Sequence, residues 1–137
     1  MAIIGIGVDA VTIERLGAAK LSDHALSRLF HPEEVAQALQ LDGLRRAEFL
    51  ASRFAAKEAF AKALGCGFSK VVPCEVCVRG DALGKPSLHT EGKTAALIDT
   101  AHAVIHLSLT HEGPLAMAFV VIESVDPDCR EVADGPL

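Results

Sequence analysis

Residues 53–62, within a longer segment 46–64, bring one carboxylate and three of the chain's cations together in a way that phosphate chemistry could use. Glu58 and Lys62 are four residues apart, so on a helix they share one flank and stand one turn apart. Arg53 and Lys57 instead fall within the apolar sector of that helix. One interpretation is a polyanion site, with a metal ion on Glu58 and phosphates on the lysines. The other, which the periodicity alone favours, is a half-buried helix whose long cationic side chains reach solvent and whose Glu58 and Lys62 form an ordinary surface pair.

A second carboxylate, Asp9, stands near the end of the first predicted strand, residues 3–11. The pattern alternates, with Ile4, Ile6 and Val8 on one face and Gly5, Gly7 and Asp9 on the other. Glycine weakens a strand, so two glycines beside Asp9 indicate that a backbone or a ligand approaches this face closely. Asp9 is therefore either a rigidly held functional carboxylate or a cap for the short helix predicted over residues 12–17.

The segment that carries Glu58 predicts a helix over residues 46–64. It contains strong helix formers and no internal Gly or Pro, and glycines follow its end. Shorter helices are predicted from Ser22, a typical N-cap, and from Pro32, a typical first residue of a helix. The second is expected to end at Asp42-Gly43, with Leu39 facing inward. The remaining pattern predicts a hairpin over residues 71–78 and 85–89, an Ala-rich helix over 92–102, a strand over 104–109, a turn over 111–114 and a strand over 115–123. The last strand is a nearly continuous apolar run, as expected for a strand buried on both faces.

The composition is that of one soluble domain. The chain has 137 residues, half of them apolar, which is enough to form a core without disulfides or a structural metal. No apolar run approaches the length of about 20 residues needed to span a bilayer, and no basic segment precedes the first strand, so we expect a cytoplasmic protein without a membrane partner. The net charge of −5 argues against nucleic acid as the main partner. We expect residues 124–137, which are acidic, to form a flexible tail without a chemical role.

The chain has four cysteines, and two of them, Cys74 and Cys77, form a C-x-x-C pair that could suggest zinc or redox chemistry. The pair lies in an alternating strand pattern, so its side chains are expected to point to opposite faces of the strand. No second pair completes a tetrahedral zinc site. We therefore expect free, mostly buried thiols.

Four blocks of the sequence stand out together. They are Gly5-Ile6-Gly7-Val8-Asp9; Arg53-Phe54-Ala55-Ala56-Lys57-Glu58-Ala59 with Lys62-Ala63-Leu64-Gly65; Leu83-Gly84-Lys85-Pro86; and Leu107-Ser108-Leu109-Thr110-His111-Glu112. In their order and spacing they resemble the holo-acyl-carrier-protein synthases, the small type of 4′-phosphopantetheinyl transferase. The K-E-x-x-x-K core on a helix is the most specific part of the resemblance, which implies one transferase domain over residues 1–123.

The resemblance implies a Mg²⁺-dependent transfer of the 4′-phosphopantetheine arm from coenzyme A to a serine of apo acyl carrier protein, as in fatty acid biosynthesis. The other product is adenosine 3′,5′-bisphosphate. Asp9 and Glu58 are the implied metal ligands, in agreement with the one or two carboxylates that Mg²⁺ usually takes beside water and phosphate. Lys62 would neutralise the pyrophosphate. Lys57 could assist deprotonation of the attacking serine, although Asp9 or a metal-bound water is an equal candidate for that base.

The resemblance also assigns residues to coenzyme A binding. Besides Lys62, these are Arg53, Gly65, Gly84, Lys85, Pro86, Ser108 and His111. His111 matches the active-site histidine of the family, a phosphate or adenosine contact, whereas Arg53 either lines the site or packs in the core with a salt bridge. Where the family often has Gly-Thr-Gly, this chain has Gly65-Cys66-Gly67, which replaces a hydroxyl beside the pyrophosphate with a thiol.

The fold implied by the resemblance is α+β, with a small antiparallel sheet and a long central helix packed on it. The implied assembly is a homotrimer with active sites at the subunit interfaces. Residues 10–31 are locally basic in an acidic chain. The implied partner is the acidic acyl carrier protein, which Arg15 and Arg28 would contact unless they are ordinary surface cations.

Two other functions fit part of this pattern. A Mg²⁺-dependent nucleotide phosphohydrolase would also use two carboxylates and a lysine, but the chain has neither a P-loop nor an acidic cluster for two metals. A non-catalytic module that binds coenzyme A or a carrier protein would be expected to lack Asp9, Glu58 or Lys62, and all three are present.

Overall fold

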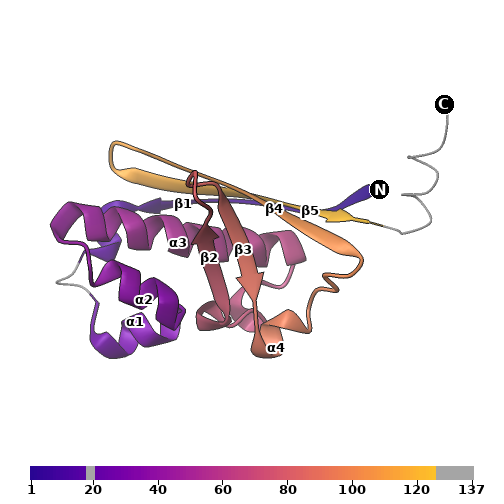
Figure 1. Cartoon of the computed structure of the whole chain (residues 1–137), viewed down its shortest axis with the longest axis horizontal. Helices are drawn as coiled ribbons and strands as arrows, with labels where there is room; N and C mark the ends of the chain where they lie inside the picture. The colour runs from indigo at the N-terminus through magenta and orange to yellow at the C-terminus, as the bar shows by residue number, and fades with distance from the viewer. Residues whose placement is uncertain (18–20, 126–137) are drawn as a thin grey trace.

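The computed structural model describes residues 1–17 and 21–125 (Figure 1). The chain starts with a long strand, continues through helices and a short hairpin, and ends in two more long strands. In order, the elements are β1 (Ala2–Thr12), η1 (Ile13–Leu16), α1 (Asp23–Leu29), α2 (Pro32–Ala38), α3 (Gly43–Leu64), η3 (Gly67–Ser69), η4 (Pro73–Glu75), β2 (Val76–Gly80), β3 (Pro86–Thr90), α4 (Gly92–Ala95), β4 (Ala103–Glu112) and β5 (Leu115–Ser124). The predicted α+β class is confirmed.

The three long strands form an antiparallel sheet in the order β1-β5-β4, so the last strand is central and the first lies at an edge. β2 and β3 form a separate two-stranded hairpin. Figure 1 shows α3 lying along one face of the long sheet, with α1, α2 and α4 on the side of the helix away from the sheet. α3 is thus a middle layer, the long central helix that the resemblance implies.

β1 and α3 approach each other so closely that no side chain fits between them. A Cβ added to Gly7 would lie 2.8 Å from the backbone nitrogen of Ala63 and would overlap the carbonyl group of Ala59. A Cβ added to Gly5 would overlap the carbonyl group of Ala63. The close approach predicted for this face of the strand is confirmed, and its partner is the backbone of α3. The contact also places Asp9, on the same face, against the helix.

α3 is buried on most of its circumference because small residues dominate it. Its buried residues include seven alanines, at positions 47, 51, 55, 56, 59, 61 and 63. Alanine is the strongest helix former and keeps the helix thin, so other elements can pack closely on two sides of it. The helix begins at Gly43, earlier than the predicted Arg46. It ends as predicted, with Gly65 in the left-handed conformation at φ 76°.

The segment between the hairpin and the sheet differs from its prediction. The helix predicted over residues 92–102 stops at Ala95. Farther along, Asp99 accepts a hydrogen bond from the Ala101 amide and pairs with the His102 ring, and this turn directs the chain into the sheet. β4 extends to Glu112, so His111, predicted in a turn, lies on a strand instead.

Two further boundaries also differ. The strand predicted over residues 71–78 begins only at Val76, because Pro73 opens a 3-10 turn that takes Cys74 out of the strand. The helix that starts at Pro32 ends at Ala38, and Leu39, predicted to face inward, is 55% exposed. Both errors arise where a short segment had too few residues to show its period.

The sheet leaves one apolar face uncovered. Alternate residues of β5 pack against α3, but the residues between them are exposed, so the prediction that this strand is buried on both faces is wrong for the single chain. On β1, Ile6 and Val8 pair with Val121 and Phe119 and point to this same side of the sheet, whereas the register shift between Ile3 and Gly5 takes Ile4 out of the alternation. We call this surface the outer face, and its exposed apolar residues are Ile6, Val8, Met117 and Phe119.

Among the helices of the described residues, none has the length and apolar character needed to cross a membrane. Ser124 still belongs to β5, whereas residues 126–137, most of the predicted tail, lie outside the described part of the chain.

Replacing Gly7 by Ala is expected to destabilise the fold by about 3 kcal/mol or more, because the added methyl group meets helix backbone that cannot rotate away. Gly80→Ala is the matched control, since the nearest atom to its added Cβ is the Cα of Gly84 at 4.0 Å. Its free energy of unfolding should change by less than about 1 kcal/mol. Urea unfolding measures both variants, and equal losses of stability would contradict the close contact.

Candidate active site

Asp9 and Lys62 meet where the exposed edge of β1 crosses the end of α3. The Lys62 ammonium donates to Asp9 Oδ1 at 3.0 Å and to the carbonyl oxygen of Val8 at 3.0 Å. The Asp9 side chain is 15% exposed and the Lys62 side chain is 53% exposed, so both can be reached from solvent. The alternative role of Asp9 as a helix cap is wrong, because Thr12 is the N-cap of η1 and no side chain caps that turn.

Glu58 lies beside this pair and is affected by it. Partial burial raises the pKa of the Glu58 carboxyl group, and the negative charge of Asp9 raises that pKa further. The positive charges of Lys62 and Arg15 offset part of the rise. Two carboxylates and two cations are therefore close enough to influence each other at one edge of the molecule. We call Asp9, Glu58 and Lys62 the carboxylate cluster.

The carboxylate cluster has the chemistry of a magnesium site. Mg²⁺ prefers oxygen ligands and usually binds to one or two carboxylates while keeping waters or phosphates in its other positions. Asp9 and Glu58 supply such a pair, and the raised pKa of Glu58 indicates that a nearby cation would be favoured. The residues present thus fit a divalent metal ion.

A second cluster surrounds Arg53. A hollow of about 240 Å³ is lined by Ser52, Arg53, Gly80, Gly84, Pro86, Leu109, Thr110 and His111. A hollow of about 220 Å³ shares Ser52, Arg53 and His111 with the first and adds Leu41, Arg45, Glu48 and Phe49. We call these two hollows together the arginine cleft. It gathers Arg53, Gly84, Pro86 and His111, four of the residues predicted to bind coenzyme A.

Arg53 has few partners in the arginine cleft. Its Nη1 donates to the Ser52 hydroxyl at 3.0 Å, and its guanidinium lies 4.1 Å from the centre of the Phe49 ring. Its Nε is buried without a hydrogen-bond partner, and no carboxylate of the described residues forms an ion pair with it. Burial lowers the pKa of Arg53, although the guanidinium stays charged. A partly buried cation without its own anion indicates a place for the anion of a ligand. The predicted alternative, a core salt bridge, is not found.

The carboxylate cluster and the arginine cleft lie on opposite sides of α3. Arg53 and Lys62 are nine residues apart, which at about 3.6 residues per turn directs them to opposite sides of the helix. The sheet register agrees, because Asp9 pairs with Ala118, which pairs with Leu109 beside the arginine cleft. Two strand spacings, about 10 Å, separate the edges that carry the two groups.

Lys57 belongs to neither group. Its ammonium is fully buried, pairs with Glu34 at 2.6 Å, and donates to the carbonyl oxygens of Pro73 at 2.9 Å and of Val76. A general base must come within hydrogen-bond reach of the proton that it removes. The predicted catalytic role of Lys57 therefore does not fit the structure, because the side chain is enclosed and its donors already have partners.

The remaining residues of the predicted site lie outside both the carboxylate cluster and the arginine cleft. Gly65 caps α3 one turn beyond Lys62, and its amide is satisfied within the helix. Lys85 is exposed at the tip of the hairpin, and Ser108 is exposed on the outer face of β4. Arg15 and Arg28 are both exposed, and Arg15 alone acts on the pKa of Glu58.

Arg45 and Ser52 also line the arginine cleft, although the sequence had not predicted them as site residues. Arg45, Phe49 and Arg53 are spaced by four residues, so they follow one face of α3. That spacing was visible in the sequence, but the predicted helix began at Arg46 and left Arg45 out.

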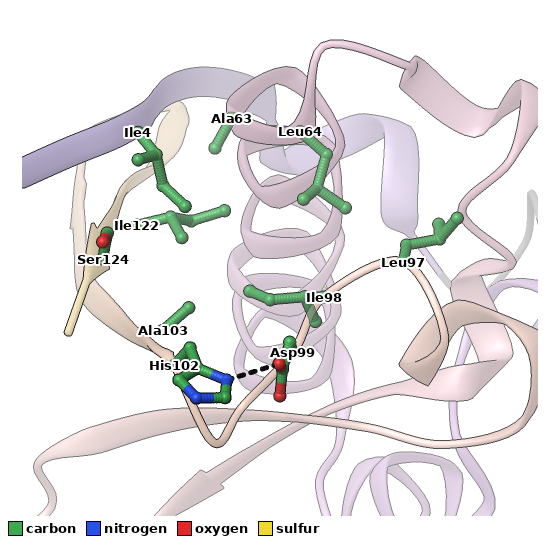
Figure 2. Close-up of a pocket in the computed structure, with 10 residues that line it drawn as sticks. All are labelled: Ile4, Ala63, Leu64, Leu97, Ile98, Asp99, His102, Ala103, Ile122 and Ser124. Carbon is green, nitrogen blue, oxygen red and sulfur yellow. Dashed lines mark hydrogen bonds and ion pairs between the residues drawn. The ribbon is translucent and has the colours of Figure 1, made fainter. Parts of the chain in front are cut away.

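A third hollow is lined mainly by apolar side chains and does not suit a phosphate group. It has a volume of about 350 Å³ and lies at the end of α3 (Figure 2). Its lining consists of Ile4, Ala63, Leu64, Leu97, Ile98, Asp99, His102, Ala103, Ile122 and Ser124. The only ion pair drawn among them joins His102 to Asp99 at 2.6 Å. None of the predicted site residues lines it.

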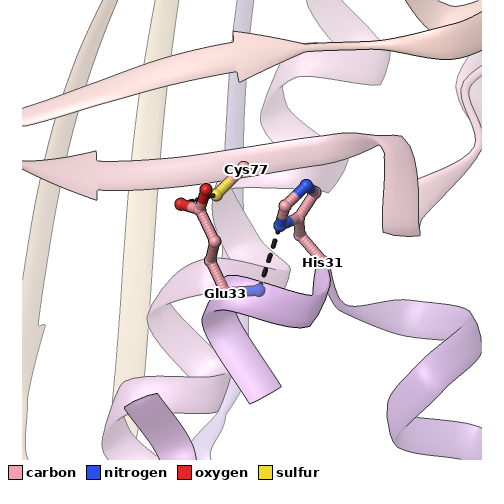
Figure 3. A group of neighbouring side chains, drawn as sticks. All are labelled: His31, Glu33 and Cys77. Carbon is pink, nitrogen blue, oxygen red and sulfur yellow. Dashed lines mark hydrogen bonds between the residues drawn. The ribbon is translucent and has the colours of Figure 1, made fainter. Parts of the chain in front are cut away.

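One group of possible metal ligands lies where the start of α2 meets β2 (Figure 3). It consists of His31, Glu33 and Cys77, whose possible ligand atoms are within 4.8 Å of one another. These atoms already have partners. Arg79 binds both oxygens of Glu33 at 3.0 Å, and Glu33 N donates to His31 Nδ1 at 3.1 Å. Burial and the nearby carboxylates also raise the pKa of the Cys77 thiol to about 11, which disfavours the thiolate that metals bind. We therefore assign the group to packing.

The cysteines of the described residues, Cys66, Cys74 and Cys77, are free. Only Cys77 is buried, whereas Cys66 and Cys74 are partly exposed. The expectation of free thiols is thus confirmed for these three, and the expectation that most are buried is not.

Comparison with known proteins places this geometry in context. Residues 5–120 match the 4′-phosphopantetheinyl transferase superfamily. The chain is 42% identical over 131 residues to the holo-[acyl-carrier-protein] synthase of Zymomonas mobilis, covering 89% of this chain and 97% of that one.

Solved structures are similar as well. The holo-(acyl-carrier-protein) synthase of Bacillus anthracis in complex with CoA (3′,5′-ADP) has a TM-score of 0.76 at 38% identity, covering 90% of this chain and 99% of that one. The holo-[acyl-carrier-protein] synthase of Neisseria meningitidis has a TM-score of 0.78 at 35% identity, covering 89% and 99%.

Asp9→Asn is expected to lower the pKa of Glu58, because it removes a like charge while leaving the partial burial unchanged. At a pH near the pKa that Glu58 has in the wild-type protein, Glu58 should therefore be more fully ionised in the variant. Carbon-13 NMR titration of the Glu58 carboxyl group measures the change. Asp23→Asn, which removes an exposed acid that does not act on Glu58, is the control. An unchanged or higher pKa in Asp9→Asn would contradict the carboxylate cluster.

Proposed function

The chain belongs to the 4′-phosphopantetheinyl transferase superfamily, and on that premise we propose how its carboxylate cluster and arginine cleft serve the reaction. The reaction moves the 4′-phosphopantetheine arm of coenzyme A to a serine of apo acyl carrier protein and leaves adenosine 3′,5′-bisphosphate. The observation that carries the proposal is the separation of two anion-handling groups on opposite sides of one helix. Coenzyme A has two separate sets of phosphates, the pyrophosphate and the 3′-phosphate, to occupy them.

The carboxylate cluster takes the pyrophosphate. Asp9 and Glu58 would hold Mg²⁺, which would supply positive charge to balance the phosphate oxygens. Lys62 is half exposed and held beside Asp9, so its ammonium can turn from Asp9 to a phosphate oxygen. Gly65 lets the chain turn sharply next to this position without a side chain that would obstruct the substrate.

In the transfer step, the serine hydroxyl oxygen attacks the phosphorus that carries the pantetheine arm. The bond from that phosphorus to the bridging oxygen breaks, and the electron pair leaves with adenosine 3′,5′-bisphosphate. Lys62 stabilises the charge that develops on the leaving group. The serine proton passes to an exposed group of the carboxylate cluster, for which Asp9 is our candidate, because Lys57 is enclosed.

The arginine cleft takes the adenosine end with its 3′-phosphate. Arg53 offers a partly buried guanidinium without a carboxylate partner, and Arg45 and His111 line the same hollow. Gly84 and Pro86 supply a wall of the neighbouring hollow, where the hairpin backbone can come close to the ligand. These contacts explain why phosphate recognition and phosphoryl transfer use different parts of α3.

We propose that the two groups that act on one coenzyme A come from two subunits of a homotrimer. Within one chain α3 stands between them, so the arginine cleft of one subunit has to meet the carboxylate cluster of its neighbour. The apolar outer face supplies a surface for such an assembly, since an uncovered patch of this kind marks an interface. Ser108, on the outer face, and Lys85, at the hairpin tip, would then approach the site from the interface.

Arg15 and Arg28 are the proposed contacts for the acidic carrier protein. Arg15 follows β1 in the chain and lies near Glu58, so a carrier bound there would present its serine to the carboxylate cluster. Attraction between exposed charges is screened by salt, so this association should weaken as ionic strength rises. We place the reaction in the cytoplasm, where free thiols such as Cys66 stay reduced.

The transfer can be tested by weighing the carrier. Incubation of the protein with coenzyme A, Mg²⁺ and apo acyl carrier protein should add the mass of one phosphopantetheine group to the carrier, as measured by mass spectrometry. Glu58→Gln should lower the rate by about 100-fold or more, because it removes a charged metal ligand. Full activity of this variant would exclude Glu58 as a metal ligand, and an unmodified carrier with the wild-type protein would exclude the transferase.

Subunit sharing can be tested by mixing two variants of strongly reduced activity. Glu58→Gln damages only the carboxylate cluster, and Arg53→Gln damages only the arginine cleft. In trimers assembled randomly from equal amounts of both, about a quarter of the interfaces join two intact halves. The mixed preparation should therefore recover about a quarter of wild-type activity. If the activity of the mixture stays at the average of the two variants although the subunits exchange, both groups act within one chain.

A further inference from the structure

Glu34 and Lys57 form a buried ion pair next to the arginine cleft. Both side chains are 0% exposed, and Lys57 Nζ lies 2.6 Å from Glu34 Oε1. The ammonium also donates to the carbonyl oxygens of Pro73 and Val76, so its hydrogen-bonding capacity is fully used. It lies 5.7 Å from the centre of the Phe30 ring. Burial lowers the pKa of Lys57, and the charge of Glu34 opposes that change.

Glu34 connects three elements through its two oxygens. Oε1 accepts hydrogen bonds from the His31 amide at the start of α2 and from Lys57 on α3. Oε2 accepts a hydrogen bond from the Val78 amide on β2, the strand that leads to the hairpin tip. The carboxylate thus has a fixed position between α2, α3 and the hairpin. A carboxylate that accepts several hydrogen bonds in the interior needs a cation nearby.

The negative charge of Glu34 acts on two cations of α3. Lys57 and Arg53 are four residues apart, so they stand on the same face of the helix, one turn apart. The negative charge of Glu34 reaches Arg53, where it partly offsets the effect of burial on the pKa. Nevertheless, Arg53 forms no ion pair with any carboxylate in the described ranges, whereas Lys57 is bound to Glu34 directly.

We propose that Lys57 is a positioning residue that satisfies Glu34 and thereby leaves Arg53 free to bind a phosphate group of coenzyme A. This inference depends on the proposed function, in which the arginine cleft takes the 3′-phosphate. Without Lys57, the buried carboxylate would face Arg53 as the nearest remaining cation on that face of the helix. An arginine drawn to a carboxylate offers fewer donors to a phosphate, because its fork can serve only one such partner well at a time.

The test is the preference of the enzyme for coenzyme A over 3′-dephospho-coenzyme A, measured as the ratio of kcat/KM for the two substrates. A general loss of structure lowers both rates and leaves their ratio unchanged, so the ratio reports on the 3′-phosphate contact alone. Arg53→Gln gives the ratio expected when that contact is lost. Thermal unfolding monitored by circular dichroism shows which variants are folded.

Lys57→Met should lower the preference about tenfold, toward the value for Arg53→Gln, because the charge-assisted hydrogen bond between Arg53 and the 3′-phosphate is weakened. The double variant Glu34→Gln with Lys57→Met should restore the preference to within about threefold of wild type, because the competing carboxylate is gone. An unchanged preference in Lys57→Met, or an equal loss in the double variant, would overturn the inference.

Lys57→Met leaves a buried carboxylate unpaired, and if this variant fails to fold, Glu34→Gln decides the matter. This variant should keep a preference equal to or above that of wild type, and a fall would show that Glu34 supports the phosphate contact. Failure of the proposed function looks different. In that case the wild-type protein does not modify the carrier, or it shows no preference that Arg53→Gln removes.

Discussion

The contact between the backbones of β1 and α3 determines where the reactive groups of this protein stand. Glycines on the strand and alanines on the helix remove every side chain that would otherwise separate the two elements. The strand can therefore bring Asp9 within 3.0 Å of Lys62, a residue 53 positions later in the sequence. A wider separation would leave both side chains in place but would break the hydrogen bond that joins them.

The same narrow helix separates two different electrostatic environments. On the β1 side, carboxylates are close together and partly exposed, which favours a metal ion. On the other side, cations line the arginine cleft, and the nearest buried carboxylate, Glu34, is already satisfied by Lys57. The acidic net charge of the protein therefore conceals a local excess of positive charge where the substrate phosphates are proposed to bind.

Much of this arrangement could be predicted from sequence, and the exceptions have physical causes. The long helix and the first strand were clear because they have many residues over which a period can be recognised. The four blocks contain all three residues of the carboxylate cluster and half of those that line the arginine cleft. The enclosure of Lys57 was not predicted because its partner, Glu34, is 23 positions away, and only the folded chain shows that they meet. The short helices after Pro32 and Gly92 were misjudged because tertiary contacts, rather than helix propensity, decide where they end.

The apolar outer face affects how readily single chains associate with one another. Ile6, 62% exposed in the single chain, and its neighbours on β1 and β5 form a surface that water solvates poorly. β1 is also an edge strand, whose unpaired backbone groups can pair with other chains. A surface of this kind can pair with other chains either in an ordered assembly, such as the proposed trimer, or in an aggregate, and both depend on how many copies are present. In the proposed trimer, expression level would then control not only the amount of the enzyme but also the fraction of chains with a complete site.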